Sequence, residues 1–167
     1  MVHPPRGLGA RTTLVLAFID GYWALGPLRG SLMSDVASAS AGAKVVAATC
    51  CDDKHSFFNV LDNDEATFWS TTGMYPHELV VQLANPAKIS KVKMMTTNVR
   101  RLVLERGDSL DRFEKVFDIE LPDRAGRQQT ETHQVNFRAG YLKFIFASGW
   151  DQFATVHRIN VTGDPSA

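Results

Sequence analysis

The sequence predicts an all-β protein, an antiparallel jelly-roll β-sandwich of about eight strands. From Lys44 onward, short segments alternate apolar and polar residues, and Gly, Pro, Asn or Asp residues separate them. No segment sustains the 3.6-residue apolar period of an amphipathic helix, and only one short helical turn is expected, near residues 56–61. Short strands at this spacing build a sandwich or a barrel, and the jelly roll is one common arrangement.

The first half of this region should supply four strands. They are residues 44–49, 78–83, 88–96 and 99–105. The second of them places Leu79, Val81 and Leu83 on one face. Asn85 and Pro86 should break the chain between the second and third strands, because proline has no N–H to give to a ladder.

The second half should supply four more strands. They are residues 113–121, 128–137, 141–147 and 155–162. Residues 122–126 have the composition of a turn between the first two. The segment 128–137 is polar and should lie at a sheet edge, whereas 141–147 is apolar on both faces and should be a central, covered strand.

The first 42 residues differ from the rest and are expected to lie outside the fold. Residues 12–28 are mostly apolar, but polar and turn-forming residues interrupt them, so they are too short to span a bilayer. They resemble a signal peptide, yet Met33 opens a second plausible start. We expect residues 1–32 to be a foreign extension, 33–42 a flexible lead-in, 43–164 the jelly-roll domain and 165–167 a tail.

The composition points to no nucleic-acid or membrane partner and to an intracellular protein. The 18 Lys and Arg residues balance the 18 Asp and Glu residues, so no positive excess favours nucleic acid or anionic lipid. Cys50 and Cys51 are adjacent, and a disulfide between neighbours would be strained. A chain without a disulfide framework suits a reducing compartment.

No catalytic motif is present, and the sequence predicts a protein that is not an enzyme. There is no Gly-x-Ser-x-Gly nucleophile turn and no glycine-rich phosphate loop followed by Lys and Ser or Thr. The five histidines do not pair with one another or with cysteine at a metal-binding spacing.

One segment is dense in oxygen atoms that could bind a calcium ion, which takes about six to eight oxygen ligands. Its oxygen-bearing residues are Asn59, Asp62, Asn63, Asp64 and Thr67. It is not an EF-hand, because Thr67 and Gly73 stand where that loop needs glycine and glutamate. From the local pattern alone, a solvated turn with side-chain caps is favoured. Trp69, directly after it, is expected in the core.

The segment 59–69 resembles the N-x-x-D-G/N-x-x-x-T-x-W signature of galactose-binding-like, F5/8 type C jelly rolls. The stretches 68–76, 141–145 and 151–157, with 47–49 and 53–55, resemble more narrowly the intraflagellar transport protein 25 family, also called the small heat shock protein beta-11 homologues. The resemblance covers roughly residues 44–163.

This resemblance implies a jelly roll without enzymatic activity, found in the cilium or flagellum and the cytoplasm. It implies a heterodimer with intraflagellar transport protein 27, a Rab-like small GTPase, within the complex B train that carries cargo. It also implies one structural calcium ion, with Asn59, Asp62 and Thr67 as ligands. The sequence does not identify the residues that contact partners.

One departure bears on the calcium site. Many related sugar-binding modules complete the site with a glutamate in the last strand, but residues 156–159 contain no carboxylate here. Carbonyls or water would have to complete the ligand set, so we expect a weak-to-moderate site. The alternative function is an extracellular, calcium-dependent carbohydrate-binding module, against which the lack of disulfides argues.

Overall fold

Eight antiparallel strands form one hydrogen-bonded network in the second of the chain's two units, Met33–Ala167. The computed structural model describes residues 15–19, 22–26 and 33–165. Of the first unit, Met1–Leu32, it describes an antiparallel hairpin of β1 (Val15–Ile19) and β2 (Tyr22–Gly26). The remaining residues of the expected 1–32 extension, and most of the expected 165–167 tail, lie outside the described residues.

The second unit contains almost no helix. Its strands are β3 (Ser34–Asp35), β4 (Lys44–Ala48), β5 (Trp69–Ser70), β6 (His77–Thr97), β7 (Val99–Gly107), β8 (Glu114–Glu120), β9 (Gln128–Gly149) and β10 (Thr155–Asp164). Two short 3-10 helices accompany them, η1 (Ala39–Ala41) and η2 (Phe57–Leu61). The expected short helical turn is therefore confirmed as η2.

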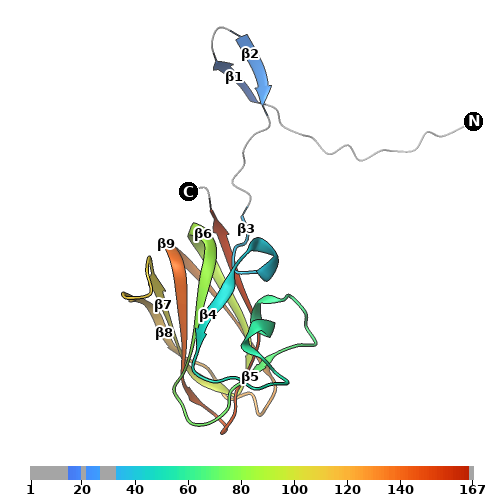
Figure 1. Cartoon of the computed structure of the whole chain (residues 1–167), viewed down its shortest axis with the longest axis vertical. Helices are drawn as coiled ribbons and strands as arrows, with labels where there is room; N and C mark the ends of the chain where they lie inside the picture. The colour runs from blue at the N-terminus through green and yellow to red at the C-terminus, as the bar shows by residue number, and fades with distance from the viewer. Residues whose placement is uncertain (1–14, 20–21, 27–32, 166–167) are drawn as a thin grey trace, which may run out of the picture. The chain divides into compact units, whose positions relative to one another are not determined.

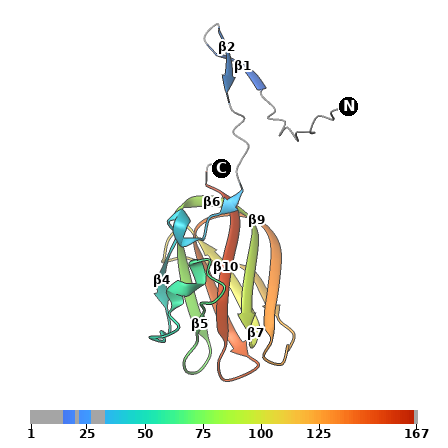
Figure 2. The same cartoon turned by 90° about the vertical axis from the view of Figure 1, so that its right-hand side faces the viewer.

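The network folds into two layers because β6 and β9 bend and serve both (Figures 1 and 2). The first part of β6 pairs with β4, and its second part pairs with β10. Likewise the second part of β9 pairs with β7, which carries β8 on its other side. β6 continues through Asn85 and Pro86, where a break was predicted, and only its register with β9 shifts there, between Gln82 and Ala87. The result is the predicted jelly-roll sandwich.

The core lies between the two layers and is built from alternate residues of the long strands. Its largest fully buried side chains include Trp69, Phe144, Phe146, Leu79, Ile89, Met94, Leu102, Leu104, Leu142 and Ile159. Trp69 meets Phe146 edge-on, with ring centroids 5.7 Å apart. Trp69 is therefore a core residue, as predicted, and it fixes the end of the oxygen-rich loop that precedes it.

Six of the eight predicted strands lie within observed strands. The other two extend past them: 44–49 by one residue beyond β4, and 113–121 by one residue at each end of β8. The segments 78–83 and 88–96 are two parts of β6, and 128–137 and 141–147 are two parts of β9. The first part of β9 pairs with β6 alone among the described strands, so it is an edge, as predicted. The second part is central, between β6 and β7, but only its inner face is fully buried, since Lys143 and Ile145 remain partly exposed.

The expectation of a flexible lead-in at residues 33–42 was wrong. Ser34 and Asp35 form β3 and pair with Gly163 and Thr162 at the end of β10. Val36 then packs into the core at 7% exposure. The Asp35 carboxylate holds this junction, because its Oδ1 accepts the Val161 N–H over 2.9 Å. The folded unit therefore begins near Ser34, before the expected boundary at residue 43.

No helix in the described part of the chain combines the length and apolar character needed to cross a bilayer.

Candidate functional site

The oxygen-rich loop between η2 and β5 is held by short-range hydrogen bonds to its own oxygen atoms. Asp62 Oδ1 accepts the Asp64 N–H over 2.9 Å, and Asp64 Oδ1 accepts the Ala66 N–H over 2.9 Å. The Thr67 hydroxyl donates to Asp62 Oδ2 over 2.7 Å and lies 3.2 Å from the Asp64 carbonyl oxygen. Two of the three predicted calcium ligands, Asp62 and Thr67, are thus in direct contact.

The third predicted ligand, Asn59, lies at the base of the loop. Its Nδ2 donates to the Phe68 carbonyl over 3.0 Å, which ties the two ends of the loop together. Among the described residues it forms no hydrogen bond with Asp62 or Thr67. The structure therefore gives Asn59 a loop-closing contact.

The oxygen atoms of the loop are of the type that binds one hard cation. The Asp62 carboxylate, the Thr67 hydroxyl and the Asp64 carbonyl are all oxygens and lie together, and calcium prefers oxygen ligands. In the described part of the chain, no group of three or more His, Cys, Asp or Glu side chains could hold a metal ion. An ion here would rely on few charged ligands, and few charged ligands give a weak site.

Arg158 of β10 contributes a positive charge to this loop from the strand in which related modules carry a glutamate. Its Nη2 donates to the Asn63 carbonyl over 2.6 Å, and its Nη1 lies 3.6 Å from a Glu65 carboxylate oxygen. The side chain is only 19% exposed, and its Nε is buried with no partner among the described residues. The last strand therefore gives the loop hydrogen-bond donors.

The aromatic residue that ends the loop is packed between two histidines. Phe68 stacks on His55, with ring centroids 4.1 Å apart, and meets His157 at 5.4 Å. Burial lowers the pKa of His157 below its ordinary value. Because Phe68 is half-buried between two imidazole rings, it is not a free platform for a sugar.

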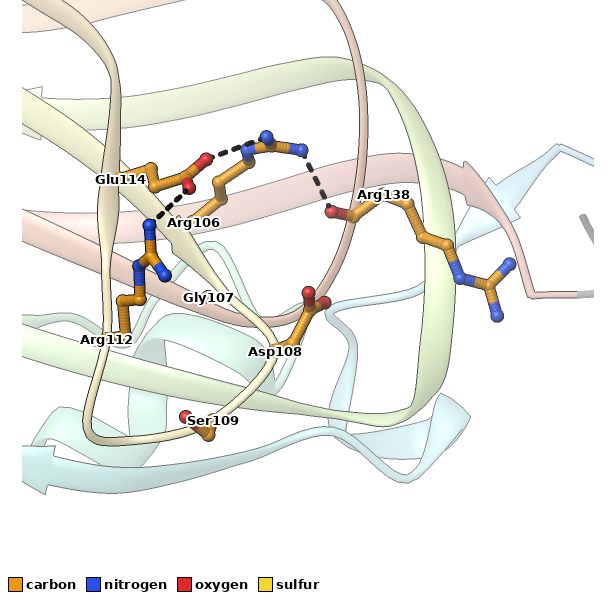
Figure 3. A pocket seen from close by; sticks show the side chains of 7 residues that line it. All are labelled: Arg106, Gly107, Asp108, Ser109, Arg112, Glu114 and Arg138. Carbon is orange, nitrogen blue, oxygen red and sulfur yellow. Dashed lines mark hydrogen bonds and ion pairs between the residues drawn. The ribbon is translucent and has the colours of Figure 1, made fainter.

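A polar pocket lies at the turn between β7 and β8, with charged side chains from β7, the turn, β8 and β9 (Figure 3). The Glu114 carboxylate lies between two arginines, 2.8 Å from Arg106 and 3.7 Å from Arg112. Arg106 also donates to the Arg138 carbonyl, and Figure 3 shows the Arg138 guanidinium extending away from this contact. These contacts brace the turn and engage three of the five charged side chains that line the pocket.

Two stretches that carry the sequence resemblance, 68–76 and 151–157, lie side by side. Trp69 and Ser70 pair with β10. Next to them, the Thr71 N–H donates to the Ala154 carbonyl over 3.0 Å, and the Ala154 N–H donates to Thr71 Oγ1 over 2.9 Å. The Tyr75 hydroxyl donates to the Asp151 carbonyl over 3.2 Å. Apart from Trp69 as a core residue, the sequence singled out no residue in these stretches, because the only signal was that both resemble the same family.

Known structures share this fold. A family 32 carbohydrate-binding module from Clostridium perfringens, solved with galactose, has a TM-score of 0.66 at 16% identity, over 78% of this chain and 98% of that chain. A chitosan-binding module from Paenibacillus sp. IK-5 has a TM-score of 0.67 at 14% identity, over 78% of this chain and 99% of that chain. At such identities the likeness is one of fold.

Curated relatives are much closer in sequence. Intraflagellar transport protein 25 of Chlamydomonas reinhardtii is 47% identical over 133 residues, which are 78% of this chain and 70% of that protein. The mouse homologue is 37% identical over 135 residues, 77% of this chain and 92% of that protein. No family model matches the chain. On the strength of these relatives, the chain belongs to the intraflagellar transport protein 25 family.

Proposed function

We propose that this chain is a non-catalytic adaptor of intraflagellar transport, a subunit of complex B that works in the cilium or flagellum and the cytoplasm. In this proposal it forms a heterodimer with a Rab-like small GTPase and supports cargo transport. The observation that carries the proposal is the 47% identity to the Chlamydomonas protein over 133 residues. An identity of this size far exceeds the 14–19% shared with the carbohydrate-binding structures.

The chemistry of the chain supports an adaptor. The sequence contains no phosphate-binding loop, so any dependence on GTP would come from the partner. Three charged groups of the polar pocket, Arg106, Arg112 and Glu114, are engaged in ion pairs that brace a turn. A protein that acts by binding needs a stable scaffold with exposed loops, and the sandwich provides both.

A rescue experiment tests this function. The chain, tagged at its C-terminus, would be expressed in Chlamydomonas reinhardtii cells that lack their own protein 25. We expect it to enter flagella and to co-purify with complex B subunits and an equal amount of a Rab-like GTPase. Recovery of the folded chain without any transport subunit would reject the proposal.

We also propose that the loop containing Asn59, Asp62 and Thr67 binds one calcium ion that serves structure. The contact between Asp62 and Thr67, together with the Asp64 carbonyl, supports this assignment. These residues would hold the ion, which would neutralise the carboxylates of the loop. The Arg158 guanidinium beside Asn63 makes us expect a weak-to-moderate affinity, because two cations near one loop repel each other.

The second candidate function is an extracellular carbohydrate-binding module, which the fold of the structural neighbours favours. A secreted chain could carry a glycan at the Asn160-Val161-Thr162 sequon. However, Asn160 Nδ2 donates to Asp35 Oδ2 over 2.7 Å and to Asn63 Oδ1 over 3.3 Å. A glycan on this nitrogen would disturb both contacts. Mass spectrometry of the chain from its native cell separates the two: a start near residue 30 with a glycan on Asn160 would favour secretion.

A further inference from the structure

An exposed, mostly apolar groove lies between the loop before β6 and the loop between β9 and β10. It has a volume of about 750 Å³, and its lining residues are Gly73, Met74, Tyr75, Ser148, Gly149, Trp150, Asp151, Gln152 and Phe153. Three large apolar side chains are exposed here: Met74 at 90%, Phe153 at 54% and Trp150 at 39%. Apolar side chains gathered in one exposed groove mark a binding surface more often than single ones do.

The aromatic walls of this groove are held in place. Trp150 donates its main-chain N–H to the Asn98 carbonyl over 2.8 Å and its indole N–H to the Leu121 carbonyl over 3.0 Å. Tyr75 is fixed by its hydrogen bond to the Asp151 carbonyl. Because these rings are already ordered, a ligand that packs on them loses little side-chain entropy on binding.

The groove carries one negative charge and no basic residue. Asp151 is the only charged lining residue, and its carboxylate accepts the Gln152 N–H over 2.7 Å. No Lys or Arg in the described residues forms an ion pair with it. The nearby Arg100 lies 4.9 Å from the Trp150 ring, but Glu120 at 2.7 Å balances its charge. A ligand with a positive charge would complement this groove.

The groove lies where the two stretches that carry the sequence resemblance meet. Tyr75 and Asp151 belong to the two stretches, 68–76 and 151–157, by which the sequence resembles its family. The carbohydrate-binding neighbours share the sandwich at only 14–19% identity. Function resides in sites carried on a fold, so a surface built from the family's own stretches is where a family-specific contact belongs.

We propose that this groove binds a partner protein through a segment that carries Lys or Arg between apolar side chains. The proposal rests on the adaptor function proposed above and names one of its contact surfaces. The apolar side chains of the segment would pack on Met74, Trp150 and Phe153, and its cation would lie at Asp151. A sugar fits less well, because a sugar site needs several converging polar side chains, and this lining is mostly apolar.

The test uses the purified full chain and a displayed library of random twelve-residue peptides. We expect selection of peptides with Lys or Arg flanked by apolar residues. A synthetic peptide of the selected sequence should bind at least about tenfold more weakly to Met74→Asp and to Phe153→Asp. Selection on Asp151→Lys should lose the basic residue. Matched controls are Leu110→Asp and Phe58→Asp, at residues that are 55% and 61% exposed outside the groove, and they should bind like the wild type.

Several results would overturn the proposal. One is that no peptide is selected, and another is that selected peptides bind Met74→Asp as tightly as the wild type. A third is that galactose-containing oligosaccharides or lipid vesicles bind the wild type and lose binding in Met74→Asp, because the occupant would then be of another class. The test needs no other transport subunit, so its failure is distinct from failure of the rescue experiment.

Discussion

The Arg158 guanidinium donates a hydrogen bond of 2.6 Å to the Asn63 carbonyl, 95 positions earlier in the chain. Asn63 has a φ of 61°, a left-handed conformation that costs free energy in residues other than glycine. The contact therefore holds a strained turn of the loop from the last strand. It also places a permanent positive charge beside the oxygens proposed to bind calcium.

Replacing this charge should tighten calcium binding. We expect Arg158→Gln to bind calcium more tightly by on the order of 1 kcal/mol, because removing a neighbouring cation removes a repulsion of roughly that size near the surface. Isothermal titration with calcium measures the change. Arg138→Gln is the control, since its side chain lies at the polar pocket and should leave affinity unchanged. Equal affinities in Arg158→Gln and the wild type would show that Arg158 does not act on the ion.

Calcium itself should stabilise the wild-type fold. Binding to the folded state alone adds about 2.7 kcal/mol at a hundredfold excess over Kd. Asp62→Ala should abolish this increment and cost about 1 kcal/mol in chelator, because Asp62 accepts hydrogen bonds from Asp64 and Thr67. Thermal melts of the wild type and Asp62→Ala, each with calcium and with chelator, measure the stabilisation by calcium and the cost of the substitution.

Asp53→Ala serves as the control for this experiment, because Asp53 is an exposed carboxylate outside the loop. It should keep the whole calcium increment. A wild-type chain that melts at the same temperature with calcium and with chelator would show that the loop is a solvated turn without a structural ion.

The long strands could be predicted from the sequence because their apolar and polar residues alternate, and this alternation indicates which side chains are buried. Leu79, Val81 and Leu83 were expected on one face, and all three are buried. The strands β3 and β5 have two residues each and are too short to show an alternation of apolar and polar residues. Ser34 joins the sheet only because Gly163 lies opposite it, and this pairing depends on the whole intervening chain.

The site could be predicted only in part, for the same reason. Asp62 and Thr67 are five positions apart, so a local pattern could join them. Arg158 approaches the loop from the last strand, and no spacing in the sequence encodes that approach. The groove joins Tyr75 to Asp151 across 76 positions. Each of its two sides contributes one glycine, and the exposed aromatic residues Trp150 and Phe153 lie in one loop, so neither loop shows a periodic pattern.

The position of the first strand leads to a prediction about chain length. A chain beginning at Met33 should unfold with the same free energy as the full chain, because the sheet begins at Ser34. A chain beginning at Ala43 should lose about 3 kcal/mol, since it lacks the buried Val36 side chain and the Asp35 contacts. Urea unfolding measures each. Equal stability of the two shortened chains would mean that β3 adds nothing to the fold.

The stability of the fold should decrease in mild acid because of His157. Burial holds the folded-state pKa of His157 below its ordinary value of 6.5. The unfolded chain therefore binds more protons, and the stabilising contribution is complete above pH 6.5 and is lost as the pH falls through the folded pKa. Unfolding free energies between pH 7.5 and 5 should fall less steeply in His157→Gln. An unchanged slope in His157→Gln would assign the effect to other groups.

The groove should be sensitive to a single methyl group at Gly149. A Cβ built there collides with the Tyr75 hydroxyl and lies 2.9 Å from the Asn98 carbonyl oxygen. Gly149→Ala should therefore push the Tyr75 ring aside, break its hydrogen bond to Asp151, and destabilise the fold by about 1–3 kcal/mol, as overpacking does.

Gly140→Ala separates this collision from the general effect of replacing glycine in β9. A Cβ at Gly140 meets only the Pro86 ring, at 3.7 Å, which is ordinary contact. Urea unfolding should place Gly140→Ala within about 0.5 kcal/mol of the wild type. Gly149→Ala should also bind the selected peptide more weakly, because Tyr75 is a wall of the groove. If Gly149→Ala matches Gly140→Ala in both stability and peptide affinity, then Tyr75 and Gly149 do not define the groove as described.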